Sequence, residues 1–249
     1  MWHIVSTGWK CDEQVRGCAE SIGCQTGVDW RWYATMDGGT VLKDDTREFL
    51  TAFDGDTKRF SNGYAVYVRL ALKNMGAMYW LADMLDGIVA DDNDRVAIVD
   101  LDDKLARDDA LAIAERYHAA GAWVTTGSYD TASGRPARFQ GPYSASENVR
   151  NSKWKASHLR TFRLGLWRRI RKRTLKGHDG QWIRTAWDLA MLLPMIEMAG
   201  VDRVAYIPEV LYTYNDTSPL NDHKLRREEQ KRTERYIRRL PPYKRVEVL

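Results

Sequence analysis

Three acids placed within four residues, Asp100, Asp102 and Asp103, have the clearest potential for chemistry in this sequence. They follow a β-branched stretch at residues 95–99 that is typical of a buried strand. Ligands of open α/β sheets bind at the carboxyl ends of strands, and clustered carboxylates repel one another unless a cation neutralises them. Because hard divalent ions take oxygen ligands and grip diphosphates, the run predicts a metal site. The alternative is a strand-to-helix turn in which one Asp caps the next helix.

A further acid, Asp188, stands between two apolar neighbours, Trp187 and Leu189. An unpaired carboxylate in apolar surroundings is costly, so Asp188 either caps a helix or takes part in chemistry. Thr185 lies three residues earlier, which permits a variant of the capping box. If a helix begins here, its N-terminus favours the ionised carboxylate that a general base must be. The sequence leaves both roles open.

Positive charge is concentrated late in the chain. The formal net charge is +4, but residues 150–178 hold 11 Lys and Arg with no acid, and residues 224–249 hold 10 basic and 4 acidic residues. Such asymmetry favours a polyanionic partner, with a solvated helix face as the alternative. The candidates for binding a phosphate or an acceptor are His158, Arg160, Arg163, Arg169 and Arg171. Trp154, Trp167 and Trp182 lie in or near this stretch, where an exposed ring could stack on a sugar or base.

Strand and helix patterns alternate through the first half, with strands expected at residues 30–36, 95–99 and 123–126. This alternation predicts an α/β fold with a doubly wound, mostly parallel sheet flanked by helices. After residue 130 we expect, in order, a long loop, a basic helix at 156–173, an apolar helix at 187–199, two short strands around Pro208 and a charged helix at 222–239. Residues 1–249 are therefore expected to form a single domain with a helical C-terminal extension.

The sequence also bears on the compartment. No apolar run reaches the roughly 18 residues that a membrane-spanning helix needs, and the N-terminus has no recognisable signal peptide. Cys11, Cys18 and Cys24 fit neither a zinc site nor a disulfide framework. We expect reduced thiols, no integral membrane contact and a cytoplasmic location.

Short segments across nearly the whole chain carry a resemblance to a known family. They are residues 4–9, 30–32, 37–40 and 74–77, followed by Asp100-Leu101-Asp102-Asp103. This ordered set resembles a family 2 glycosyltransferase of the GT-A fold. Residues 157–162, the Trp187-Asp188 pair and residues 211–215 resemble a branch of that family often found in viruses and phages.

The resemblance implies a nucleotide-sugar donor, with a UDP-sugar favoured, and Mn²⁺ or Mg²⁺ as cofactor. It divides a GT-A-like domain into a nucleotide-sugar half at 1–130 and an acceptor half at 131–249. The implied donor-binding residues are Thr7, Gly8, Asp37, Asn74 and Asp100, the implied metal ligands are Asp102 and His223, and the implied general base of an inverting transferase is Asp188. Asp37 as a plain turn former and His223 as polar surface are the alternatives. Met36 stands where the family has the first of two acids.

Phage relatives make a 5-hydroxymethylpyrimidine in duplex DNA, 5-hydroxymethylcytosine or 5-hydroxymethyluracil, the favoured acceptor. DNA presents a phosphate array to Lys and Arg, and a duplex base must be reached through a groove or flipped out. A phage enzyme of this kind would act in the host cytoplasm. The alternatives are a transferase acting on a glycan, a lipid-linked sugar or a protein, and an inactive nucleic-acid-binding module, which Met36 alone favours.

Overall fold

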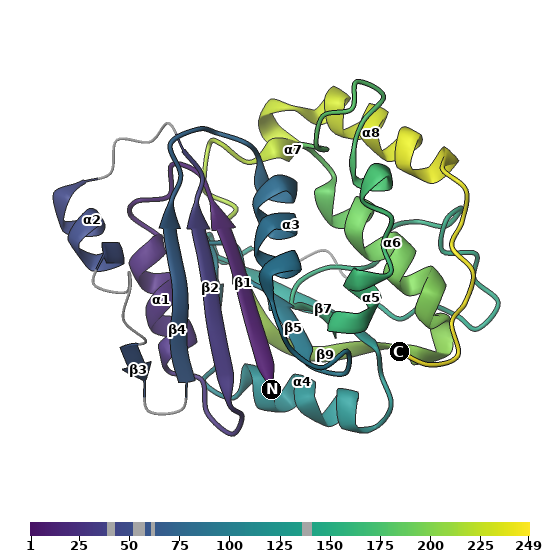
Figure 1. Cartoon of the computed structure of the whole chain (residues 1–249), viewed down its shortest axis with the longest axis horizontal. Coiled ribbons are helices and arrows are strands. Elements are labelled where there is room, and N and C mark those ends of the chain that lie inside the picture. The colour runs from purple at the N-terminus through teal and green to yellow at the C-terminus, as the bar shows by residue number, and fades with distance from the viewer. Residues whose placement is uncertain (39–42, 52–57, 61–62, 136–140) are drawn as a thin grey trace.

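The computed structural model describes residues 1–249 except 39–42, 52–57, 61–62 and 136–140. Its strands are β1 Trp2–Gly8, β2 Trp30–Met36, β3 Lys58–Phe60, β4 Gly63–Leu70, β5 Arg95–Ile98, β6 Lys104–Leu105, β7 Val124–Thr131, β8 Arg160–Arg163 and β9 Val204–Tyr214. Among the described residues, all of these join one sheet in the order β3-β4-β2-β1-β5-β8-β7-β9-β6 (Figure 1). Strands β4, β2, β1 and β5 are parallel, and β8 runs antiparallel between β5 and β7. The expected α/β fold with a mostly parallel sheet is confirmed.

Helices cover both faces of this sheet. They are α1 Val15–Gly23, α2 Asp44–Thr51, α3 Ala77–Gly87, α4 Ala110–Ala119, α5 Leu164–Arg168, α6 Trp187–Ala199, α7 Asp222–Leu225 and α8 Arg227–Arg239, with 3₁₀ turns at Lys172–Leu175 and Val201–Arg203. Successive strand residues point to opposite faces. Thus Ile4 packs in a core with α1 and α4, whereas Val5 packs in a second core with α3, α5 and α6. The two cores fix the sheet whose strand ends carry the acids.

The predicted basic helix at 156–173 is wrong. Its first part is strand β8, and only Leu164–Arg168 and Lys172–Leu175 are helical. The side chain of Phe162 is fully buried, and the Thr161 hydroxyl bonds His118 Nε2 at 2.7 Å and the Thr125 hydroxyl at 2.6 Å. Pairing with β5 and β7 therefore overrides the helical charge pattern, because it buries these two side chains inside the sheet.

The two strands predicted around Pro208 are one strand, β9, whose register against β7 shifts near this proline. A proline is tolerated at such an irregularity because its missing N–H breaks no regular ladder bond. The apolar helix predicted at 187–199 is α6, with Pro194 inside it. The charged helix predicted at 222–239 is interrupted at Arg226, between α7 and α8. In the described part of the chain, no helix is long and apolar enough to cross a membrane.

Candidate functional site

A cavity of about 310 Å³ gathers the carboxyl ends of β1, β2, β4 and β5 with the start of α6. Nine of the residues singled out from the sequence line it: Thr7, Gly8, Asp37, Asn74, Asp100, Asp102, His158, Arg160 and Asp188. They come from six separate stretches of the chain, which the sheet brings together. We call this cavity the central pocket.

The acids after β5 do not all have the same environment. Asp103 is buried, and its carboxylate accepts hydrogen bonds from the Tyr212 hydroxyl at 2.7 Å and the Asn215 amide at 2.7 Å. In contrast, the carboxylates of Asp100 and Asp102 accept no hydrogen bond from another residue in the described part of the chain, although both line the central pocket. All three acids line the cavity, but Asp103 is held by hydrogen bonds from the end of β9 and just beyond it, whereas Asp100 and Asp102 are not.

Burial and mutual repulsion act on these two carboxylates. Desolvation, followed by the charge of Asp102, raises the pKa of Asp100 to about 7, and desolvation raises the pKa of Asp102 as well. A divalent cation would relieve this cost, because it favours the ionised form of both groups. The chemistry of the donor set therefore fits the implied cation.

The described residues contain one group of candidate ligands for a cation. Asp100, Asp103 and His158 each offer one ligand atom, all within 4.8 Å of one another. Asp102, the metal ligand implied by the resemblance, lines the same pocket. The other implied ligand, His223, belongs to α7, but its side chain lies outside the described residues.

His158 and Arg160 form a buried polar pair beside the acids. Arg160 Nη2 donates to His158 Nε2 at 3.0 Å, and the imidazole is stacked on Tyr212 and Tyr214. Desolvation and then the Arg160 charge hold the pKa of His158 well below its usual value, so the ring is neutral. In the described structure, His158 Nδ1 and Arg160 Nε and Nη1 are buried without a hydrogen-bond partner. Such orphaned donors are rare in native proteins and indicate a ligand.

Asp188 lies in the first turn of α6, where the helix N-terminus favours an anion. The preceding Ala186 has a φ of 52°, a left-handed conformation that a non-glycine residue adopts at a cost. Arg160 Nη2 lies 3.4 Å from Asp188 Oδ2, and the guanidinium also lies over the Trp187 ring. The capping alternative for Thr185 finds no support, because its hydroxyl contacts Thr233 and the helix has no side-chain cap bond.

Asp37 organises the loop on the other side of the pocket. Its carboxylate accepts hydrogen bonds from the backbone amides of Met75 and Gly76, each at 2.8 Å, and from the Trp80 indole at 2.8 Å. These bonds fix the entry into α3 and hold Asn74 at the pocket wall. Asp37 thus has a positioning role in addition to lining the cavity.

Three of the predicted phosphate-binding residues lie elsewhere. Arg163 donates to Asn93 Oδ1 at 2.7 Å and to the carbonyls of Ala122 and His118. Arg169 contacts Asp92 and backbone carbonyls, and the Arg171 guanidinium lies over the Tyr243 ring at 4.5 Å. None of the three lines the central pocket. Their positive charge therefore serves contacts within the protein.

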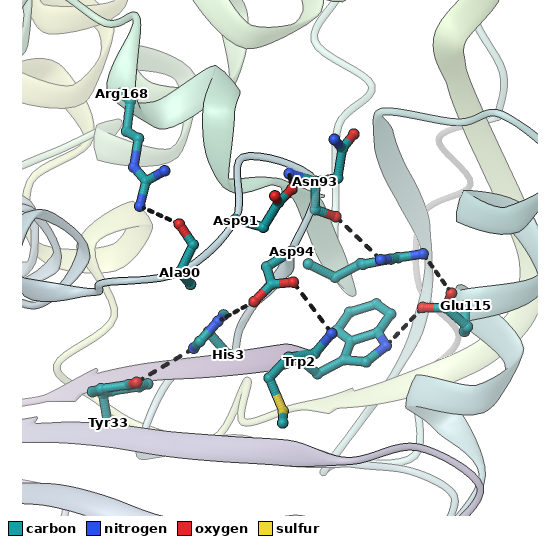
Figure 2. Close-up of polar contacts among 11 residues, drawn as sticks. Trp2, His3, Tyr33, Ala90, Asp91, Asn93, Asp94, Glu115 and Arg168 are labelled. Carbon is teal, nitrogen blue, oxygen red and sulfur yellow. Dashed lines mark hydrogen bonds and ion pairs between the residues drawn. The ribbon is translucent and has the colours of Figure 1, made fainter. Parts of the chain in front are cut away.

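The loop at 90–94 shows the environment that this basic stretch meets. Arg168 contacts Asp92. Figure 2 shows its bond to the Ala90 carbonyl and the bond between His3 and Asp94. In Figure 2 the loop sits over Trp2, whose indole donates to Glu115 at 2.9 Å. This end of the sheet is a network of intramolecular ion pairs.

Sequence reasoning missed two polar contacts at the pocket. Arg184 lines it and donates through Nη1 to Asn74 Oδ1 at 2.8 Å and through Nη2 to the Asn74 carbonyl at 3.1 Å. The Trp154 indole donates to Asp188 Oδ2 at 3.3 Å. The sequence gives no signal for the Arg184 bond, because its partner lies 110 residues away.

Comparisons with known proteins agree with this architecture. The chain is similar to the TarS protein of S. aureus, a GT-A-type family 2 glycosyltransferase. Against TarS 1–349 in complex with UDP the identity is 11% and the TM-score 0.65, covering 95% of this chain and 64% of that chain. Against TarS 1–349 in complex with UDP-GlcNAc the values are 12%, 0.64, 95% and 65%. A longer TarS chain gives 12% and 0.62, with 88% of this chain and 37% of that chain covered.

The chain thus spans less than two thirds of the length of these TarS chains. No family model matches it, and no curated protein matches it either. At such low identity the likeness shows the fold alone. It confirms the expected GT-A-like α/β architecture.

Proposed function

We propose that this protein is a metal-dependent glycosyltransferase that moves a sugar from a UDP-sugar to an acceptor hydroxyl with inversion. One observation carries the proposal. The carboxylates of Asp100 and Asp102 face Asp188 and Arg160 across a single pocket, at the ligand-binding end of a GT-A-like sheet. Candidate ligands for a cation, a hydrogen-bond donor for an anion and a candidate base therefore line one cavity.

The donor diphosphate would bind next to Arg160. Its orphaned Nε and Nη1 donors can bond phosphate oxygens, which the planar guanidinium suits. Gly8 lines the same pocket, and a Cβ there would lie 2.5 Å from Cys11 Sγ and from Leu101 Cβ. Only glycine therefore lets the backbone pass at this point. Asp102 and Asp100 would hold Mn²⁺ or Mg²⁺, which supplies neutralisation of the leaving diphosphate when bound.

Asp188 would act as the general base. Its carboxylate takes the proton of the acceptor hydroxyl while that oxygen forms a bond to the anomeric carbon. The bond from the anomeric carbon to the diphosphate oxygen breaks on the opposite face, so the configuration inverts. Arg160 would act on both sides of this reaction, because its guanidinium lies 3.4 Å from Asp188 Oδ2 and the residue lines the pocket in which the diphosphate would bind.

For the acceptor, we propose a 5-hydroxymethylpyrimidine in DNA, acted on in the cytoplasm. Cationic side chains at the pocket, Lys10, Arg184 and Arg226, support an anionic acceptor. A glycan hydroxyl is the second candidate. It is favoured by Trp9 and Trp187, which also line the pocket and offer aromatic rings of the kind on which sugars stack.

The test is sugar transfer followed by mass spectrometry. The protein is incubated with Mn²⁺ and UDP-GlcNAc or UDP-glucose, with DNA containing 5-hydroxymethylcytosine or 5-hydroxymethyluracil or with a panel of saccharides. The proposal expects one acceptor to gain the mass of one N-acetylhexosamine or one hexose residue, according to the donor, and Asp188→Asn to remove this gain. Transfer to a saccharide alone replaces the DNA acceptor with the glycan. DNA binding with neither transfer nor UDP release would instead identify an inactive binding module.

A further inference from the structure

The proposed base has one oxygen held and one oxygen open. Asp188 Oδ2 receives the Trp154 indole N–H at 3.3 Å and lies 3.4 Å from Arg160 Nη2. In the described part of the chain, no residue donates a hydrogen bond to the other oxygen, Oδ1. The side chain of Asp188 is 22% exposed and lines the central pocket. The open oxygen is therefore the one that can meet an acceptor hydroxyl.

Trp154 contacts Asp188 from a loop that other contacts hold in place. The next residue, Lys155, pairs with Glu147 at 2.7 Å, and its amide bonds the Tyr143 hydroxyl at 3.3 Å. Trp154 itself packs against the core that contains α6. A donor on such a braced segment can hold its acceptor in one orientation, because its own position is set by packing.

We propose that Trp154 is a positioning residue for the Asp188 base, and this inference rests on the proposed function. The indole N–H, together with Arg160, anchors Oδ2 and turns Oδ1 toward the acceptor. The acceptor proton then passes to Oδ1 as the acceptor oxygen forms its bond to the anomeric carbon and the nucleoside diphosphate departs. Catalytic hydrogen bonds are often long before substrate binds, so both contacts are expected to shorten in the complex.

Trp154 differs from Trp167 and Trp182, the other tryptophans in or near residues 150–178, in the partner of its indole N–H. Trp167 is fully buried, and its indole donates to Asp86 at 2.7 Å. Trp182 packs edge-on against Tyr79 and, in the described structure, donates to no carboxylate. Trp182→Phe is therefore the matched control, because it removes an indole N–H from the same half of the chain without touching Asp188.

The functional test measures UDP release from UDP-GlcNAc and Mn²⁺ across a range of pH. Trp154→Phe keeps the ring and loses the N–H, so kcat should fall about 10-fold, as for the loss of one hydrogen bond to a charged group. The KM for UDP-GlcNAc should stay within about twofold. The acid limb of the pH profile should move to higher pH, because the ionised carboxylate has lost a donor. Trp182→Phe should show none of these changes.

A second measurement needs no turnover. In the ¹⁵N-labelled protein, the indole resonance of Trp154 is identified by its disappearance in Trp154→Phe. It should shift in Asp188→Asn, while the Trp182 indole resonance stays in place. A Trp154 resonance that does not respond to Asp188→Asn overturns the inference, even where UDP release is too slow to measure.

The two proposals fail in different ways. If Asp188→Asn releases UDP at the wild-type rate, the base assignment in the proposed function is wrong. If Asp188→Asn is inactive but Trp154→Phe keeps the wild-type kcat and pH profile, only the positioning role of Trp154 is wrong.

Discussion

The charged side chains at the two ends of the sheet differ in whether they have hydrogen-bond partners inside the protein. At the amino ends of β1 and β5, Arg95 and the Trp2 indole share Glu115, and His3 bonds Asp94 (Figure 2). At the carboxyl ends, the side-chain carboxylates of Asp100 and Asp102 accept no hydrogen bond from another described residue. Most charged groups at the amino end have internal partners, whereas at the carboxyl end Asp37 and Asp103 are hydrogen-bonded but Asp100 and Asp102 are not.

Strand β8 carries the contrast within four residues. Arg163, beside the start of β5, spends its donors on Asn93 and two carbonyls. Arg160, beside the end of β5, keeps Nε and Nη1 buried and unpaired in the described structure. Native proteins satisfy nearly all buried polar groups, so the unpaired donors of Arg160 support the proposal that a ligand binds at the carboxyl end of the sheet, although Arg95 Nε at the amino end is also unpaired in the described structure. Charge counts along the sequence cannot make this distinction.

The largest effect is expected from the acids. Asp102→Asn should abolish sugar transfer and weaken Mn²⁺ binding, because a neutral amide is a poor ligand for a hard cation. The matched control at the opposite end is Asp91→Asn, which alters a turn acid and should leave both properties unchanged. Transfer assays and calorimetric titration with Mn²⁺ measure the two. Full wild-type activity in the presence of excess chelator would contradict the cation site.

Asp188→Asn should reduce the rate of transfer on the order of 10²-fold or more, the usual cost of losing a general base. UDP affinity in the presence of Mn²⁺ should change little, because Asp188 faces the acceptor side. The comparison is made by single-turnover transfer and by UDP titration. A collapse of UDP binding with normal residual chemistry would make Asp188 a structural residue.

The two arginines of β8 give the sharpest paired test. Arg160→Gln should weaken UDP binding about 10-fold, since charged hydrogen bonds contribute about 1.5–3 kcal/mol. Arg163→Gln should leave UDP binding unchanged and lower the free energy of unfolding by a similar amount, because its three internal contacts are lost. UDP titration and urea unfolding of both variants decide the question. Equal effects of the two substitutions on UDP binding would remove the contrast.

Much of the fold could be predicted from the sequence, and so could many of the residues that line the central pocket. Alternating apolar residues identify strands such as residues 30–36, and the acids after residue 99 identify the ligand-binding end of the sheet. Strand β8 escaped prediction because arginines stand on both sides of Thr161 and Phe162, and the run resembles a basic helix in sequence. The sequence also could not show that the carboxylate of Asp103 is hydrogen-bonded whereas those of Asp100 and Asp102 are not. This difference depends on Tyr212 and Asn215, more than 100 residues away.

The smallest expected effect concerns His118, a buried histidine. Both of its ring nitrogens are hydrogen-bonded, one to the Ala122 carbonyl at 3.0 Å and one to the Thr161 hydroxyl at 2.7 Å, whereas Nδ1 of His158 has no partner in the described structure. Desolvation lowers the pKa of His118 from 6.5 to about 4. Between these two pH values the unfolded chain binds a proton that the folded protein excludes.

The contribution of His118 to stability is therefore fully present above pH 6.5 and is lost as the pH falls toward 4. The loss amounts to about 1.4 kcal/mol per pH unit within this window. His118→Gln should be less stable than the wild type at pH 7, because one or both bonds are lost, yet its free energy of unfolding should fall less steeply toward pH 5. Urea unfolding at half-unit steps of pH gives both slopes. Identical slopes would show that His118 takes up its proton as readily in the folded protein as in the unfolded chain.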